Sequence, residues 1–184
     1  MRRIAFVLWV GAAACSPESS PPAPKPPERG GGPMGASGSV PSPADIIRFE
    51  VPQGWVRETP SNPMRKAQIR IPDKDGKAGD AELTVFFFGP DRNLLQANLD
   101  RWARQMGSSD PKPEAFEGRC RVTLLDLSGT YRSDFEPQPI ENARMLAAVV
   151  EASDGPWYFK FVGPADTVGD WREEFVAVLK GAYR

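Results

Sequence analysis

The chain has two cysteines, Cys15 and Cys120, and no histidine among its 184 residues. Histidine is the commonest general base and the commonest metal ligand in proteins, so its absence excludes Ser-His-Asp, Cys-His and His-zinc mechanisms. Two cysteines can form neither a four-thiolate zinc site nor a disulfide-rich scaffold. The side chains that remain for chemistry include these two thiols, the carboxylates and the basic residues.

The first 15 residues have the pattern of an export signal that ends in a cysteine. Arg2 and Arg3 precede an apolar run, residues 4–14, which is too short for a membrane-spanning helix of about 20 residues and fits a secretory signal. The small residues 12–14 directly before Cys15 resemble a bacterial lipobox. This resemblance implies cleavage after Ala14 and a diacylglyceryl thioether on Cys15. The alternative is an ordinary signal peptide with an Ala-x-Ala cleavage site, in which Cys15 has no role.

Residues 16–43 have the composition of a disordered tether. Nine prolines, five glycines and six serines occupy 20 of these 28 positions. Such a segment cannot bury enough apolar surface to offset the entropy of ordering it. We therefore divide the chain into a lipoprotein-type signal peptide (1–14), the lipidated Cys15 with a disordered tether (15–43), and a single globular domain (44–184) that is long enough for one hydrophobic core.

Three aspartates, Asp73, Asp75 and Asp80, lie in a polar loop and could suggest a calcium site. The EF-hand pattern requires an oxygen ligand at loop position 5 and a glutamate at position 12, but these positions hold Lys77 and Thr84. A solvated hairpin loop is the better interpretation, because the lysines of the loop would oppose a cation.

Two other charged pairs also have simple structural interpretations. Glu173 and Glu174 are adjacent, so on a helix they diverge by about 100° and cannot flank one bond as catalytic carboxylates. Arg101 and Arg104 beside Trp102 could bind phosphate or nucleic acid. However, four of the chain's 23 basic residues and two of its 24 acidic residues precede the domain, which leaves the domain with a net charge of −3. We therefore expect no nucleic-acid partner and interpret these arginines as an exposed helix face.

Cys120 and the tryptophans of the domain are interpreted as structural. Arg119 and Arg121 could activate the Cys120 thiol, but no histidine can act as its base, so a half-buried apolar role is favoured. Core packing is favoured over a sugar-binding platform for Trp55, Trp102, Trp157 and Trp171, because each has periodic apolar neighbours. We thus expect no catalytic, cofactor-binding or metal-binding residue, and we assign roles only to Cys15 and Ala14, at the lipidation and cleavage sites.

Hydrophobic periodicity predicts the elements that position these residues. Alternation predicts strands over 46–51, 55–58, 65–71, 81–88 and 119–127, near Tyr131, and over 144–152 and 157–162. An Asp-Gly pair at 154–155 predicts a hairpin between the last two strands. Helical spacing predicts one helix that is capped by Asp91 or Asn93 and ends at Gly107, and a second over 167–181. Hairpins dominate this order, so the expected fold class is α+β, a mostly antiparallel sheet layered with helices.

Three stretches together suggest a family. They are a Phe-x-x-Pro-x-Gly-Trp pattern over residues 49–55, the aromatic strand before residues 98–102, and the closing hairpin of residues 157–159 with its C-terminal helix. In this layout the chain resembles the PsbP/Mog1-like superfamily, and within it the uncharacterised bacterial lipoproteins. The resemblance implies an antiparallel sheet between helices. It transfers no site residue, because the members with known roles share no catalytic set. These members are photosystem accessory subunits, a small-GTPase partner and envelope lipoproteins.

These features predict a lipid-anchored protein of the bacterial cell envelope, held by the lipid on Cys15 in the outer membrane and facing the periplasm or the cell surface. We expect a non-catalytic domain that binds a protein or another envelope component. Two alternatives stay open: a small-molecule binding protein with a cleft between sheet and helix, and an enzyme that uses carboxylates alone. A groove lined by Trp or Tyr would favour ligand binding. An exposed apolar patch above about 400 Å² would favour a protein partner. Two facing acids with raised pKa values would favour an enzyme.

Overall fold

The structure, a computed structural model, describes residues 46–90, 94–133 and 138–184. All of these residues belong to one compact unit of the chain. Its strands are β1 (Val56–Glu58), β2 (Arg65–Ile71), β3 (Ala81–Phe87), β4 (Glu114–Glu117), β5 (Arg121–Tyr131), β6 (Ile140–Ala152) and β7 (Gly155–Pro164). Its helices are α1 (Leu95–Gln105), α2 (Ala165–Asp170) and α3 (Arg172–Gly181). The predicted α+β class is confirmed.

The strands form one antiparallel sheet. Its order is β1-β2-β3-β7-β6-β5-β4, and every neighbouring pair is antiparallel. Strands β6 and β7 form the predicted hairpin, with Ala152 opposite Gly155 across a tight turn. Gly155 has a φ of 122°, which side chains of L residues rarely allow. The Asp-Gly pair therefore marks the turn correctly.

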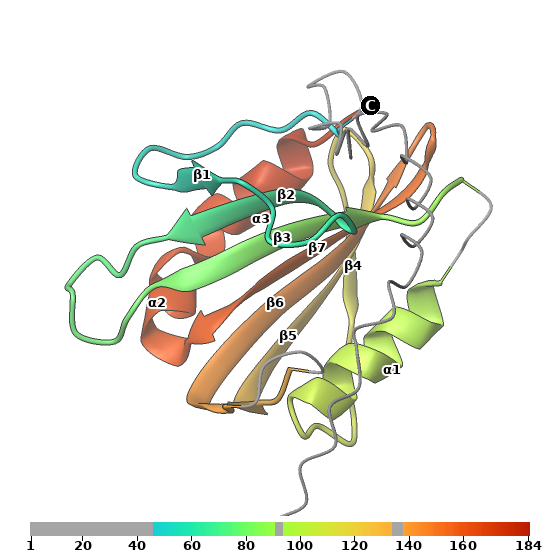
Figure 1. Cartoon of the computed structure of the whole chain (residues 1–184). Helices are drawn as coiled ribbons and strands as arrows, with labels where there is room; N and C mark the ends of the chain where they lie inside the picture. Colours follow the sequence, from blue (N-terminus) through green and yellow to red (C-terminus); the bar gives the residue numbers. More distant parts are fainter. Residues whose placement is uncertain (1–45, 91–93, 134–137) are drawn as a thin grey trace, which may run out of the picture. The chain divides into compact units, whose positions relative to one another are not determined.

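The two faces of the sheet support separate hydrophobic cores, because successive side chains of a strand point to opposite faces. On one face, Phe159 and Phe161 of β7 pack with Phe175 of α3. On the other face, Tyr158 of β7 packs with Trp102 of α1. The domain thus has three layers, with α2 and α3 on one side of the sheet and α1 on the other (Figure 1).

The start of the domain differs from the sequence prediction. Residues 46–51 do not form a strand, and Arg48 alone makes a β-bridge, to Tyr183 near the chain end. Two hydrogen bonds form this bridge: the Arg48 N–H donates to the Tyr183 carbonyl (2.8 Å), and the Tyr183 N–H donates to the Arg48 carbonyl (3.0 Å). The alternation of the segment is real, but the pairing does not extend to Glu50, because Gly181, which would lie opposite it, belongs to α3.

The region of β4 and β5 also differs. The sequence predicted two strands here, but strand β5 continues through Tyr131. Its pairing with β6 becomes irregular between Gly129 and Tyr131, which explains why the alternation of apolar residues is interrupted there. Strand β4 was not predicted. It is an edge strand with three of its four residues exposed, so it lacks the alternation that would reveal it.

The predicted helix over 167–181 is two helices, α2 and α3, which meet at Trp171. The backbone of Trp171 is not helical (φ −109°, ψ 11°), and its indole N–H donates to the Pro72 carbonyl at 2.8 Å. Its ring is also edge-on to Trp55, with 6.0 Å between ring centres. The tertiary contacts of the Trp171 side chain therefore accompany a break in the helical backbone at this residue.

Helix α1 agrees with its predicted apolar stripe, and Gly107 follows it with a φ of 68°, as expected for a residue that ends a helix. Its N-cap residue is Leu94. The predicted caps, Asp91 and Asn93, lie outside the described residues.

Candidate functional site

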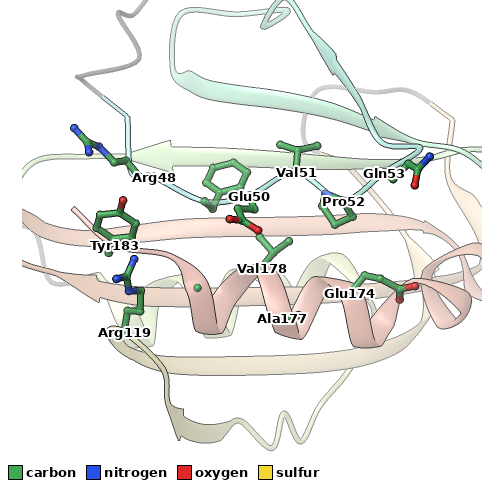
Figure 2. Close-up of a pocket in the computed structure, with 12 residues that line it drawn as sticks. Arg48, Glu50, Val51, Pro52, Gln53, Arg119, Glu174, Ala177, Val178 and Tyr183 are labelled. Atoms are coloured by element: carbon green, nitrogen blue, oxygen red, sulfur yellow. The ribbon is translucent and has the colours of Figure 1, made fainter.

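A groove of about 700 Å³ lies between residues 48–53 and helix α3. Figure 2 shows this segment running alongside the helix in the opposite chain direction. Apolar side chains from both walls line the groove, including Val51 of the segment and Ala177 and Val178 of α3. Its volume falls within the range of about 300–1,000 Å³ that is typical of small-ligand sites.

The segment wall is fixed at both of its ends. Ile47 is buried, and the ring of Phe49 packs edge-on against an aromatic ring of β7 with 5.5 Å between centres. At the other end, the N–H of Trp55 donates to the carbonyl of Pro52 (3.2 Å), and Gly54 supplies the φ of 93° that this turn needs. The backbone between these two points is held in place without pairing to another strand.

The helix wall is fixed by the core. Phe175 and Leu179 of α3 are fully buried, and the Phe175 ring lies 5.4 Å from that of Phe161 on the sheet. This orientation leaves Glu174 and Ala177 on the side of the helix that lines the groove. One face of α3 therefore builds the core, while another face builds the candidate site.

Two arginines and a tyrosine form the cationic end of the groove. Figure 2 shows Tyr183 between Arg48 and Arg119. The guanidinium carbons of Arg48 and Arg119 lie 5.9 Å and 4.2 Å from the centre of the tyrosine ring, within the range of cation–π contacts. Neither arginine forms an ion pair with any residue that the structure describes. The two positive charges are thus uncompensated there.

The position of Arg119 depends on a close contact between the β4–β5 turn and α3. The Arg119 N–H donates to the Lys180 carbonyl at 2.8 Å. Directly before it, Gly118 lies so close to the helix that a Cβ atom at this position would be 2.6 Å from the Cα and carbonyl oxygen of Lys180. The absence of a side chain at position 118 therefore allows the turn to place Arg119 beside the groove.

The remaining lining of the groove carries two acidic residues. The Glu50 carboxylate points toward Val178 in Figure 2, and Glu50 forms no ion pair within the described ranges. Glu174 lies 3.5 Å from the ammonium group of Lys74, which in turn lies 4.0 Å from the centre of the Trp171 ring. The groove is therefore basic at its Tyr183 end and carries one uncompensated carboxylate along its wall.

A second cleft, of about 370 Å³, lies on the sheet face that carries α1. Most of its charged residues pair with one another: Arg65 lies 2.8 Å from Glu82, and Arg70 lies 2.7 Å from Asp80. Its remaining lysine, Lys160, donates to the Tyr131 hydroxyl at 2.9 Å. Because this cleft offers less uncompensated charge, the groove beside α3 is the better candidate site.

The residues to which the sequence assigned roles are not described by the structure. Cys15 and Ala14 lie outside the described residues, so lipidation and cleavage stay predictions. The other cysteine, Cys120, is half-buried against the hydrophobic core in the turn between β4 and β5. Burial raises the pKa of its thiol, more than the charge of Arg119 lowers it. This environment favours the structural role expected for Cys120.

The aspartate loop is held together by its own carboxylates. Asp73 accepts backbone N–H bonds from Ala78 (2.5 Å), Asp75 (3.1 Å) and Gly79 (3.1 Å), and these bonds lower the pKa of Asp73. The pKa of Asp80 is also lowered, chiefly by its hydrogen bond from Arg70. Within the part of the chain that the structure describes, no three acidic or cysteine side chains converge as metal ligands. The hairpin-loop interpretation thus has a physical basis.

The aromatic and helical candidates lie away from the groove lining, with one exception. Core positions are confirmed for the tryptophans: Trp55, Trp102 and Trp157 are buried, and Trp171 is half-buried against the core. On α1, Arg101 donates to the Asn98 side chain at 2.5 Å and Arg104 is exposed, which fits an ordinary helix surface. The exception is Glu174, which lines the groove but belongs to the first turn of α3 and pairs with Lys74.

The sequence did not reveal the groove. Arg48, Arg119 and Tyr183 come from the domain start, a turn in its middle and the chain end, and no local spacing connects them. In the sequence, only the strand-like pattern of residues 46–51 relates to the groove. This pattern indicates that the segment packs on the core, but it does not indicate which residues the segment contacts. The Arg48–Tyr183 bridge joins the first described residues of the domain to its last ones, and this contact brings the residues of the site together.

Comparisons with known proteins leave the family open. No protein-family model matches the chain, and no curated protein sequence matches it. The resemblance to the PsbP/Mog1-like superfamily therefore stays a prediction. Among the described helices, none has the length and apolar character required to cross a bilayer.

Proposed function

We propose that the protein is a lipid-anchored component of the bacterial cell envelope whose domain binds, without catalysis, a ligand with an anionic group. The observation that carries this proposal is the groove of about 700 Å³ with Arg48, Tyr183 and Arg119 at one end. Two guanidinium groups that have no carboxylate partner among the described residues can donate charge-assisted, bidentate hydrogen bonds to a carboxylate or phosphate. The apolar side chains beside them can cover the body of the ligand.

Two observations favour this function over the alternatives. In the described residues, Val56 and Met64 are the only exposed large hydrophobic side chains. Two such side chains provide little apolar surface for docking a protein partner on a flat face. Asp73, Asp80 and Asp126 have lowered pKa values and do not line the groove, so none of these three carboxyl groups is a general acid for it. Ligand binding in the groove requires neither feature.

The proposed location rests on the N-terminal sequence. An apolar run after Arg2 and Arg3, small residues up to Ala14 and then Cys15 support a lipoprotein signal, and the Pro/Gly/Ser-rich residues 16–43 support a tether. The layout of the domain supports its placement among PsbP/Mog1-like envelope lipoproteins. A domain on such a tether would meet its ligand near the membrane surface.

A titration of the ¹⁵N-labelled full chain with 4-phenylbutyrate tests the binding function, because this probe joins one carboxylate to an apolar body. We expect saturable shifts of the backbone resonances of Arg48, Arg119 and Tyr183, and no such shifts with the neutral 4-phenylbutyramide. Arg119→Gln should weaken binding by about tenfold or more. Arg57→Gln is the matched control, since Arg57 also stacks on an aromatic ring, that of Phe49 (5.2 Å), but does not line the groove. Equal shifts with acid and amide would contradict the proposal.

The anchor is tested separately by mass spectrometry of the mature protein. We expect an acylated Cys15 as the first residue, and a Cys15→Ser variant that is recovered in the soluble fraction. An unmodified terminus at Ser16, or an uncleaved leader, would refute lipid attachment without affecting the groove.

A further inference from the structure

We infer that the ligand of the groove is the carboxyl-terminal end of an extended peptide. The free α-carboxylate of the last peptide residue would bind Arg48 and Arg119. The residue that precedes this last residue would pair with the backbone of Glu50. This inference rests on the proposed function and deepens it, because it names the class of ligand and its orientation. It depends on the backbone of the segment wall, which the binding function alone does not use.

The segment wall has backbone hydrogen-bonding groups without a partner. The N–H and C=O groups of Glu50 form no hydrogen bond with any described residue, whereas both groups of Arg48 are bonded to Tyr183. In an extended chain, alternate residues direct these groups to the same side. Glu50 is therefore the next position on the side where Arg48 already pairs with Tyr183, and this side is the one that borders α3 (Figure 2).

The pairing can extend over only a short stretch. On that same side Pro52 has no N–H, and its carbonyl already accepts the N–H of Trp55. At the other end, the backbone of Arg48 is occupied by Tyr183. One residue of a bound peptide can thus form two hydrogen bonds with Glu50, and the peptide cannot continue as a strand past Arg48.

The charges set the direction of the peptide. The stretch that can pair ends next to Arg48, Tyr183 and Arg119, where two guanidinium groups that form no ion pair within the described ranges line the groove. A peptide that runs antiparallel to residues 48–53 would bring its last residue to this point, so its terminal carboxylate would receive the donors of both arginines. Capture of a chain end by a charged site beside a backbone edge is an established mode of peptide recognition.

The Glu50 and Glu174 side chains give a second element of specificity. Both line the groove on the way from the cationic end to the turn at Pro52, and Glu50 has no basic partner in the described residues. A peptide with a basic side chain or a free amino group upstream of its carboxylate would match this pattern. A peptide with acidic residues there would meet like charges and bind more weakly.

A pooled library of dye-labelled hexapeptides tests the inference with the full chain. One pool ends in free carboxylates and a second pool carries C-terminal amides. We expect the full chain to retain peptides from the free-acid pool, with Lys or Arg enriched upstream of the end. Amidation of a retained peptide should weaken its binding about ten- to hundredfold, as expected for the loss of charge-assisted hydrogen bonds. Arg119→Gln should reduce this difference, because only Arg48 then remains to bind the carboxylate, and Arg57→Gln should preserve it.

A second probe examines the backbone pairing. Methylation of the peptide nitrogen that would donate to the Glu50 carbonyl should weaken binding about tenfold, while methylation of the nitrogen before it should have little effect. Equal binding of both methylated peptides would overturn the backbone part of the inference, and equal binding of acid and amide would overturn the carboxylate part. If 4-phenylbutyrate binds and no peptide does, the proposed function stands and the peptide inference fails; if neither binds, both fail.

Discussion

Replacement of Gly118 by alanine should weaken the contact that positions the cationic end of the groove. Gly118 begins the β4–β5 turn, and its φ lies outside the left-handed region, so alanine brings no backbone strain of its own. The added methyl group would lie 2.6 Å from the Cα and carbonyl oxygen of Lys180, where ordinary contacts begin at 3.4 Å. The turn and helix α3 must therefore separate by at least 0.4 Å to reach the 3.0 Å limit of real contacts, and by 0.8 Å to restore an ordinary contact of 3.4 Å.

The cost of this separation has two parts. Forcing an extra methyl group into a packed contact costs about 1–3 kcal/mol. Loss of the 2.8 Å hydrogen bond from the Arg119 N–H to the Lys180 carbonyl adds about 1 kcal/mol. We therefore expect Gly118→Ala to lower the free energy of unfolding by about 2–4 kcal/mol, and to shift Arg119 away from Tyr183.

Urea unfolding of the full chain, followed by tryptophan fluorescence, measures this effect. Gly181→Ala is the matched control for the unfolding measurement alone, because Gly181 also lines the groove. Gly181 ends α3, a Cβ there meets no atom within 4 Å outside the backbone of its own helix, and alanine should stabilise the helix by up to about 1 kcal/mol. A Gly118→Ala protein within about 0.5 kcal/mol of the wild type would refute the argued contact. So would a variant that is destabilised but still binds 4-phenylbutyrate with wild-type affinity.

Three further perturbations test other parts of the structure. Phe175→Ala should destabilise the domain by about 3–5 kcal/mol in urea unfolding, because it empties a buried site between α3 and the sheet; a loss below about 1 kcal/mol would contradict the described packing. Burial opposes the charged form of Asp126, but hydrogen bonds and charges from Arg144 and Arg172 outweigh burial and lower the Asp126 pKa. The Asp126 carboxylate therefore stabilises the fold at pH values above its unfolded pKa. This contribution is lost as the pH falls through the lower pKa of the folded state. Asp126→Asn should therefore unfold more easily than the wild type near pH 7, with a difference that shrinks as the pH falls below 3.8, and a difference independent of pH would contradict this origin. Cys15→Ser should release the full chain from membranes on fractionation, and a variant that stays in the membrane fraction would contradict anchoring through this cysteine.

The fold was largely predictable because local periodicity reports burial. Alternation located β2, β3, β6 and β7, which lie within the sheet and bury one or both faces, and the Asp-Gly pair located their closing hairpin. The prediction failed where local pattern and tertiary contact disagree. Trp171 continues the apolar stripe of a single helix, yet its hydrogen bond to Pro72 ends one helix before the next begins.

The candidate site was not predictable in the same way. Its three defining residues, Arg48, Arg119 and Tyr183, are residue types that are common on protein surfaces. They come together through a bridge between the start and the end of the domain, and through a glycine that allows a close approach to α3. A single sequence contains neither signal, since both depend on contacts between distant residues. The lipidation motif is the reverse case, because its chemistry is local and the sequence alone predicts it.

A double-mutant cycle on the groove tests the central claim most directly. It combines the wild-type chain and Arg119→Gln with 4-phenylbutyrate and 4-phenylbutyramide, and the affinities are measured by calorimetry. If Arg119 receives the carboxylate, the coupling free energy should be about 1.5–3 kcal/mol, the value of a hydrogen bond to a charged group. A coupling below about 0.5 kcal/mol, with the acid still bound, would show that the cationic end of the groove is not the ligand site.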